Sequence, residues 1–204
     1  MAKAGGLHPT KQILIDTVVK LMDTQNASDI NSDEVLDISG ISKGSLYHHF
    51  EDFSELIEFA LVARFANFVD LSINMLNQVT IHSKTKKDFV AGIKEVTRAT
   101  QAPARANYRA ERATAIATAM RNPRMKERLG VEQERLTEAL ADLFRESIER
   151  GFGNPDLDPR TIGVLVQAYT LGQIVDDFTP THMAVENWYA LIDSIVDNVL
   201  FTKG

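Results

Sequence analysis

A short stretch of the sequence, GISKGSLYHHFEDFSEL at residues 40–56, collects many hydrogen-bonding side chains within about two helical turns. Its polar and small residues are Ser42, Lys43, Gly44, Ser45, Tyr47, His48 and His49. Side chains of these types could bind a metal ion, act as nucleophile and base, or contact nucleic acid. Their spacing and the rest of the chain distinguish among these three kinds of chemistry.

The spacing argues against a metal site and against a catalytic pair. His48 and His49 are adjacent, so on a helix they point about 100° apart and cannot share a metal as an i, i+4 pair can. The chain has no cysteine, and its other histidines are isolated: His8, His82 and His182. Ser45 and His48 lie three residues apart, but no strand-turn-helix elbow surrounds them. We therefore expect no enzyme activity, no bound metal and no cofactor.

The same stretch fits the second half of a helix-turn-helix, in which a short helix, a glycine turn and a second helix share an apolar side. The side chains expected to face inward are Val35, Leu36, Ile38, Ile41, Leu46 and Phe50, around a turn at Gly40. Lys43, Gly44, Ser45, Tyr47 and His48 would then face outward. The second helix, about 12 Å long, matches a major groove about 12 Å wide. The alternative is a helical hairpin that packs on the core, with Tyr47 and His49 half-buried.

Composition restricts the class of protein. With 44% hydrophobic and 25% charged residues the chain reads as soluble and globular, and no apolar run approaches the roughly 20 residues of a membrane span. The N-terminus, MAKAGGLHPTKQ, lacks the apolar stretch of a secretory signal, so we expect a cytoplasmic location. The formal net charge of -6 argues against a protein that coats nucleic acid without sequence preference.

Helical periodicity dominates the whole chain, and strand signals are nearly absent. We predict an all-α fold of about nine helices, three short ones in an N-terminal head (residues 1–51) and six longer ones in a C-terminal bundle (residues 52–204). The predicted spans are Thr10–Gln25, Asn31–Ser39, Lys43–Phe50, Asp52–Gln78, Lys84–Gln101, Ala104–Asn122, Arg124–Arg150, Pro159–Asp177 and Val185–Phe201. Asn31, Ser42 and Asp52 are the expected N-caps, and Asn31 with Glu34 forms a candidate capping box.

The last two predicted helices carry apolar residues around most of their circumference. The residues are Ile162, Val164, Leu165, Val166, Leu171, Ile174 and Val175 in one helix, and Trp188, Leu191, Ile192, Ile195, Val196, Val199 and Leu200 in the other. Such a stripe is wider than one core face needs, which predicts a second buried face against a partner chain. The alternative places both helices at the centre of a monomeric bundle.

GISKGSLYHHF resembles the recognition element of the tetracycline-repressor (TetR) family of bacterial transcription regulators, over roughly residues 15–56. The resemblance implies a repressor that binds a palindromic double-stranded DNA operator as a homodimer and is released by a small-molecule effector in the C-terminal bundle. It also implies dimerisation through the last two helices. Ser32 would contact a phosphate, Lys43, Gly44 and Ser45 would face bases, and Tyr47, His48 and His49 would contact the DNA backbone.

Two positions depart from the family pattern. Asp33 stands where a basic residue often follows Ser32, and Phe53 stands where a lysine usually contacts a phosphate. Up to residue 52 there are four lysines (Lys3, Lys11, Lys20, Lys43) against eight acids (Asp16, Asp23, Asp29, Asp33, Glu34, Asp37, Glu51, Asp52). Specific binding would then depend on few contacts. The alternative for Phe53 is a core residue packed beside Leu56 and Ile57. A helical ligand-binding or adaptor protein with weakened DNA binding stays open as an alternative.

The effector site is expected in the C-terminal bundle. A mostly apolar pocket with a few orienting polar groups would be lined by Phe65, Phe68, Tyr108, Arg109, Tyr169 and Gln173. Arg98, Arg105, Arg109 and Arg112 recur at helical spacing and could bind a carboxylate or phosphate. The alternative is a solvated face of arginines paired with Glu111 and neighbouring acids.

Overall fold

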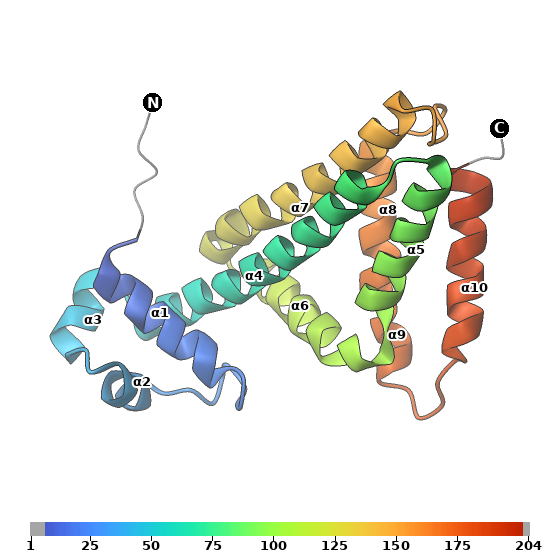
Figure 1. Cartoon of the computed structure of the whole chain (residues 1–204). Helices are drawn as coiled ribbons and strands as arrows, with labels where there is room; N and C mark the ends of the chain where they lie inside the picture. The colour runs from blue at the N-terminus through green and yellow to red at the C-terminus, as the bar shows by residue number, and fades with distance from the viewer. Residues whose placement is uncertain (1–6, 202–204) are drawn as a thin grey trace, which may run out of the picture.

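The computed structural model describes residues 7–201, and this part of the chain is helical with no strand (Figure 1). The head contains α1 (Pro9–Leu21), α2 (Ser32–Ser39) and α3 (Lys43–His49). The body contains α5 (Lys86–Gln101), the short η1 (Pro103–Arg105), α6 (Ala106–Ala119), α7 (Pro123–Glu149), α8 (Pro159–Gly172), α9 (Ile174–Asp177), α10 (Val185–Ile195) and the π-helical turn η2 (Val196–Leu200). The long α4 (Phe53–His82) joins the two parts.

The three expected N-caps are confirmed. Each side chain accepts a hydrogen bond from the backbone N–H three residues on: Asn31 from Glu34 (3.0 Å), Ser42 from Ser45 (3.2 Å) and Asp52 from Glu55 (2.7 Å). The Glu34 carboxylate accepts a bond from Gln25 Nε2 at 3.1 Å. Gly40 ends α2 in the left-handed region at φ 67°, a conformation that glycine adopts without steric cost.

The head has its own hydrophobic core. Its buried residues are Leu14, Ile15, Val18, Ile30, Val35, Leu46, Phe50, Leu56 and Ala60. Ile38 is 60% exposed, so the expectation that it faces inward is wrong. Leu36 and Ile38 lie about 160° apart around the axis of α2, and it is the side with Leu36 that packs against this core. Phe53, the first residue of α4, is half-buried against this core, as the core alternative predicted.

The body is built around α4, α7 and α8, and buried residues of these helices and of α5, α6 and α10 form a second core. Its largest fully buried side chains include Phe89, Phe144, Met125 and Ile192. Figure 1 shows α4 and α7 crossing the molecule, and the two helices pack against each other. Gly163 lets α8 approach α7 closely, because a Cβ there would lie 3.1 Å from the Leu140 side chain.

Several predicted boundaries differ from the observed ones. α1 ends at Leu21, four residues before the predicted end, and the Thr24 hydroxyl donates to the Leu21 carbonyl in the turn that follows. α4 continues to His82 and is capped by the turn at Ser83. The helix predicted to end at Asp177 is interrupted at Gln173, between α8 and α9. With α8–α9 and α10–η2 each counted as one interrupted helix, residues 7–201 contain the nine predicted α-helices.

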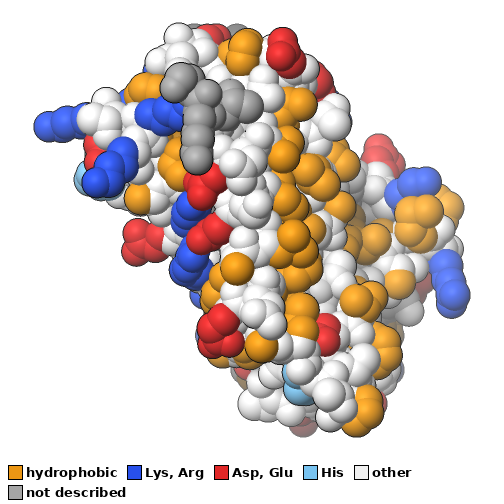
Figure 2. Space-filling view, turned by 90° about the vertical axis from the view of Figure 1, so that its right-hand side faces the viewer, with side chains coloured by type: hydrophobic (Ala, Val, Ile, Leu, Met, Phe, Trp, Pro, Cys, Tyr) orange, Lys and Arg blue, Asp and Glu red, His pale blue; other side chains and the backbone are white. Residues whose placement is uncertain are grey.

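The last two helices carry apolar residues on two faces. One face lies in the body core through Ile162, Ile192, Val196 and Leu200. The other is open to solvent, with exposed fractions of 45–65% for Val164, Leu165, Val175, Leu191 and Val199. Figure 2 views this end of the molecule and shows hydrophobic side chains gathered in a band along it. Among residues 7–201, no helix has the length and apolar character to cross a membrane.

Two glycines test the packing of α7. Gly163→Val should lower the free energy of unfolding by about 1–3 kcal/mol, because the added atoms force α8 away from α7. Gly130→Ala should raise it by about 0.5–1 kcal/mol, since Gly130 is exposed in the interior of α7 and a Cβ there meets nothing within 4 Å. Urea unfolding followed by circular dichroism measures both changes, and a stabilising Gly163→Val would contradict the close approach.

Candidate functional site

The second helix of the helix-turn-helix presents a polar surface. Its exposed positions are Lys43, Gly44, Tyr47 and His48, and Ser45 is half-buried. Leu46 and Phe50 anchor the helix in the head core with at most 2% exposure. A Cβ on Gly44 would meet no atom of the chain within 4 Å, so the backbone here is open to close approach. The predicted division into inward and outward residues of this helix is therefore confirmed except at Ser45, which was expected to face outward and is half-buried.

The two other residues expected at DNA are the first residue of α2 and the last residue of α3. Ser32 is the first residue of α2, where backbone N–H groups have no partner within the helix. The His49 ring stacks 4.6 Å from the His8 ring and 5.1 Å from the His48 ring. Partial desolvation, and then the neighbouring His8, His48 and Lys11, lower the pKa of His49, which keeps its ring uncharged at neutral pH. His49 is thus placed against α1, through the His8 ring at its N-cap.

The acidity expected of the head is reduced by arginines from α7. Arg124 binds the Glu51 carboxylate and lies 3.2 Å from the Glu58 carboxylate. Arg128 donates to Glu55 at 2.7 Å and lies over the Phe59 ring at 4.0 Å. Of the eight acids counted along residues 1–52, Arg124 pairs with Glu51 and lies 4.0 Å from Asp52, whereas Glu55 and Glu58 fall outside that count.

A large cavity lies in the body between α4, α5, α6 and α8, and it extends toward the head. Its volume is about 1310 Å³, above the 300–1,000 Å³ that is usual for small-molecule sites. Five of the six predicted residues line it: Phe65, Phe68, Tyr108, Arg109 and Tyr169. Gln173 is not among the lining residues. It is 5% exposed where α8 breaks into α9, and its Oε1 has no hydrogen-bond partner among the described residues.

The four arginines at helical spacing differ in their contacts. Arg98 binds Asp193 through two bonds of 3.1 and 2.6 Å, which confirms the alternative of a paired surface group. Arg109 is 2% exposed and binds Asp177 through two bonds of 2.6 Å. The solvated alternative is wrong for Arg109, since it is a buried structural pair, and the same pairing leaves its charge neutralised toward the cavity.

Arg112 is buried without such a partner. The residue is 6% exposed, lines the cavity, and has its guanidinium 4.2 Å from the centre of the Phe68 ring and 5.6 Å from that of Phe65. Its Nε has no hydrogen-bond partner, and no hydrogen bond or ion pair joins Arg112 to any residue between 7 and 201. Desolvation lowers the pKa of Arg112 to about 10, so it remains a cation at neutral pH. The solvated-face alternative is also wrong here.

Another part of the cavity wall is formed by Thr97, Gln101 and Thr170, which were not predicted from the sequence, beside the predicted Tyr169. Gln101 is 1% exposed, donates to the Thr170 hydroxyl at 3.2 Å and accepts a bond from Trp188 Nε1. Burial raises the pKa of Tyr169 to about 12, against the opposing effect of hydrogen bonds to Thr97 and Gln101. The only signal for these residues in the sequence was their polar type at core-facing positions of apolar helices. Helical periodicity does not define those positions precisely enough to identify the residues.

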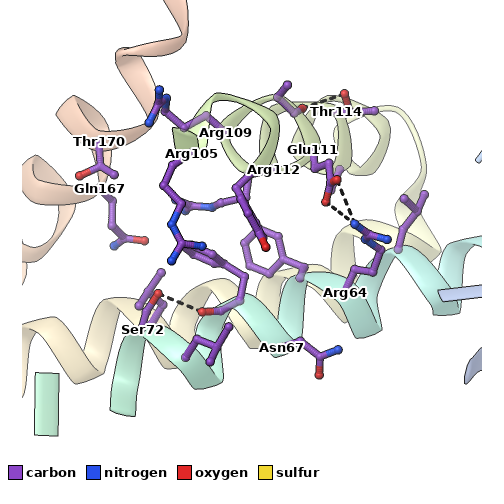
Figure 3. A pocket seen from close by; sticks show the side chains of 18 of the residues that line it. Arg64, Asn67, Ser72, Arg105, Arg109, Glu111, Arg112, Thr114, Gln167 and Thr170 are labelled. Carbon is purple, nitrogen blue, oxygen red and sulfur yellow. Dashed lines mark hydrogen bonds and ion pairs between the residues drawn. The ribbon is translucent and has the colours of Figure 1, made fainter. Parts of the chain in front are cut away.

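Arg64 connects the head to the cavity wall. Its guanidinium donates to the Val19 carbonyl at 3.3 Å and to Asp23 at 2.8 Å, both in or just after α1. The other nitrogen donates to both oxygens of Glu111 on α6, at 2.9 and 2.8 Å. Figure 3 shows this pair beside Arg112, with Gln167 and Thr170 of α8 on the opposite side of the cavity. Head, α4 and α6 are therefore joined through one side chain.

Solved structures with the same arrangement identify the fold. Salmonella enterica GusR superposes with a TM-score of 0.65 at 20% identity, over 98% of this chain and 99% of that one. A TetR-family transcriptional regulator from Mesorhizobium loti MAFF303099 superposes with a TM-score of 0.69 at 14% identity, over 95% and 97%. This chain has the TetR-family regulator fold. A scan of protein-family models and a search of curated proteins found no match.

A third structure with the TetR fold has a ligand. It is a transcriptional regulator from Saccharomonospora viridis in complex with choline, with a TM-score of 0.66 at 12% identity, over 95% of this chain and 98% of that one. Within residues 7–201 of the present chain, no group of three or more His, Cys, Asp or Glu side chains could hold a metal ion. The surfaces of this chain that are available for binding are thus the polar face of α3, the cavity and the exposed apolar band.

Replacing the two buried arginines should change the free energy of unfolding in opposite directions. Arg112→Met should raise the free energy of unfolding by about 1–3 kcal/mol, because it removes an uncompensated buried charge while keeping a long apolar stem. Arg109→Met should lower it by about 3–5 kcal/mol, because Asp177 loses its bidentate partner. Thermal and urea unfolding without ligand measure both changes. A loss of stability in Arg112→Met of the same size as in Arg109→Met would show that Arg112 is bound within the protein.

Proposed function

We propose that the chain is a DNA-binding transcriptional regulator that binds a palindromic operator as a dimer and is released by a small-molecule effector. Residues 1–51 would form the DNA-binding domain, and residues 52–204 the ligand-binding and dimerisation domain. The observation that carries the proposal is an anchored helix-turn-helix with a polar outer face, joined by one continuous helix to a body with a large cavity. Such a protein would act in the cytoplasm without catalysing a reaction.

DNA recognition would use α3 as the reading helix in the major groove. Lys43, at the first position of α3, would donate to a guanine edge, and Gly44 would allow the backbone close to the bases. Tyr47, Ser32 and the histidines would donate to phosphates, which positions the helix without reading sequence. This division assigns specificity to the N-terminal turn of α3 and general affinity to its surroundings.

Effector release would act through α4 and Arg64. Phe65 and Phe68 in the cavity wall belong to α4, whose first turns carry the head. Glu111 on α6 holds Arg64, which in turn binds the end of α1. A ligand that displaces α6 from α4 would change these contacts and so the orientation of the head. The Saccharomonospora viridis regulator in complex with choline supports the view that proteins of this fold bind small molecules.

The exposed apolar band would form the dimer interface. Val164, Leu165, Leu191 and Val199 come from the two last long helices, so pairing two copies would give a four-helix contact. Soluble monomers rarely expose contiguous apolar patches of this kind. A two-fold arrangement would also present two copies of α3, as a palindromic operator requires.

The second candidate function is a ligand-binding or adaptor protein with weakened DNA binding. Asp33 is exposed next to Ser32 and carries the wrong charge for a phosphate neighbour, and Lys11 lies 3.8 Å over the Phe59 ring. These two observations reduce the number of basic groups at the DNA-facing surface. A mobility-shift assay with the DNA upstream of the chain's own coding sequence separates the two functions, because only the regulator retards it at nanomolar to micromolar protein.

Two substitutions in α3 test the division of roles. Lys43→Ala should remove about 1–3 kcal/mol of discrimination at one base pair in each half-site, because it deletes a base contact. Tyr47→Phe should weaken binding to all sequences by one common factor, because a lost phosphate contact carries no sequence information. Affinities are measured on the operator and on single-base variants of it.

The matched control for these variants is Lys20→Ala, which removes an exposed lysine of the head from α1. It should leave the ranking of operator variants unchanged. If Lys43→Ala and Tyr47→Phe reduce affinity equally on every sequence, α3 does not read bases through Lys43. If the wild-type chain retards no upstream fragment at low salt, the regulator proposal fails and the adaptor function is favoured.

Charge in the apolar band should separate the dimer. Leu191→Glu and Val199→Glu, at side chains 56% and 45% exposed in one protomer, should give monomers in light scattering with normal helix content. Val196 is unsuitable for this purpose because it is 1% exposed in the protomer's own core. Val131→Glu, on the exposed side of α7, is the matched control and should remain dimeric. A dimer that survives both changes in the band would place the interface elsewhere.

A further inference from the structure

We propose that the effector of this protein is an amphipathic organic anion, with a compact headgroup such as a carboxylate or sulfonate bound by Arg112 and an apolar body in the rest of the cavity. The inference rests on the proposed function and specifies its ligand. The charges of the cavity wall select this ligand class, because the shape of a cavity this large selects poorly among ligands.

The first step is that Arg112 lacks an anion. A buried guanidinium is normally paired with a carboxylate, and an unpaired one is costly in free energy. Arg109, one helical turn away on the same helix, has its carboxylate in Asp177. Arg112 has only the faces of Phe65 and Phe68, which leave the N–H groups at the edge of the guanidinium without an acceptor among residues 7–201.

The second step is that the charges of the wall sum to a positive value. Three carboxylates line the cavity among the described residues: Asp23 and Glu111 share the single charge of Arg64, and Glu58 binds Arg124 and Arg128. Arg105 lines the cavity two helical turns before Arg112 and stacks over the Tyr108 ring at 4.8 Å. With Arg109 neutralised by Asp177, the charges of Arg64, Arg105 and Arg112 exceed those of Asp23 and Glu111, so the net charge at the cavity is positive. A cationic ligand such as choline would be repelled, so the ligand of the Saccharomonospora viridis regulator does not fit this wall.

The third step concerns the rest of the ligand. Apart from the charged residues just described, the wall is made of aliphatic and aromatic side chains such as Leu61, Ile93 and Val166, with neutral groups at Gln101 and Thr170. These can bury an apolar body and accept or donate one or two hydrogen bonds, but they offer no second charge. A small inorganic anion would leave most of the cavity unfilled, and a neutral apolar ligand would leave Arg112 unpaired.

Two fluorescent dyes that differ only in a charged group test the inference. 1-Anilinonaphthalene-8-sulfonate is an amphipathic anion, and N-phenyl-1-naphthylamine is the same molecule without its sulfonate. The wild-type protein, without DNA, should bind the anion at least about tenfold more tightly than the neutral dye, relative to the partition of each dye into detergent, because charge-assisted hydrogen bonds are the strong ones. Octanoate should displace the bound anion, and octan-1-ol at the same concentration should displace it at least about tenfold less effectively.

Variants assign the preference to Arg112. Arg112→Met should weaken the sulfonate dye by about tenfold or more while changing the neutral dye by less than about twofold, and Arg112→Lys should retain part of the preference. The matched control is Arg145→Met, which removes an exposed arginine that binds Asp142 outside the cavity. It should change neither dye. Because Arg112→Met is expected to be at least as stable as the wild type, loss of binding in it cannot be attributed to unfolding, and its melting curve verifies this.

The outcomes are separable from those of the proposed function. A wild-type protein that binds both dyes alike, only the neutral dye, or neither overturns the anionic effector, whatever the DNA assay shows. Equal loss of both dyes in Arg112→Met also overturns it, since Arg112 would then act only in packing. A failure to bind operator DNA with the dye preference intact would instead reject the regulator and leave an anion-binding protein.

Discussion

The structure depends on one helix, α4, belonging to two hydrophobic cores. Leu56 and Ala60 are buried in the head, and Phe65 and Val69, a few residues later, are buried in the body. At 1.5 Å per residue its 30 residues span about 45 Å without interruption. A change of tilt at the body end must therefore move the head, because no loop between them can absorb it. Phe65 and Phe68, the rings beneath Arg112, lie on this helix as well.

Most of the fold could be predicted from the sequence because its signals are local. Asn31, Ser42 and Asp52 set helix starts through their own side chains, and a glycine at residue 40 suits the left-handed turn. Helix ends were less predictable, since they depend on contacts made elsewhere. α4 outlasts its predicted end because Val79 is buried in the body core near the end of the helix. The break at Gln173 likewise lies where α9 brings Asp177 to Arg109.

The candidate sites likewise contain some residues that could be predicted from local sequence and others that could not. The polar face of α3 follows from periodicity, since Leu46 and Phe50 fix which side is buried. The cavity residues on a single helix were also predictable, as with Phe65 and Phe68. What could not be predicted was which arginines are paired, because Asp177 lies 68 residues from Arg109 and Asp193 lies 95 residues from Arg98. Helical spacing placed Arg105, Arg109 and Arg112 on one face, and only the tertiary fold distinguishes the paired arginine from the unpaired one.

The hydrogen bond between Trp188 and Gln101 has an optical consequence. The chain contains a single tryptophan, so its intrinsic emission comes from one known place on α10. That indole is bonded to a side chain in the cavity wall, at Gln101, and lies on the helix that also carries the exposed Leu191. The protein thus carries an unlabelled reporter between its interior and its outer apolar band. A change in the wavelength or polarisation of its fluorescence would record a change in the cavity or at the outer apolar band.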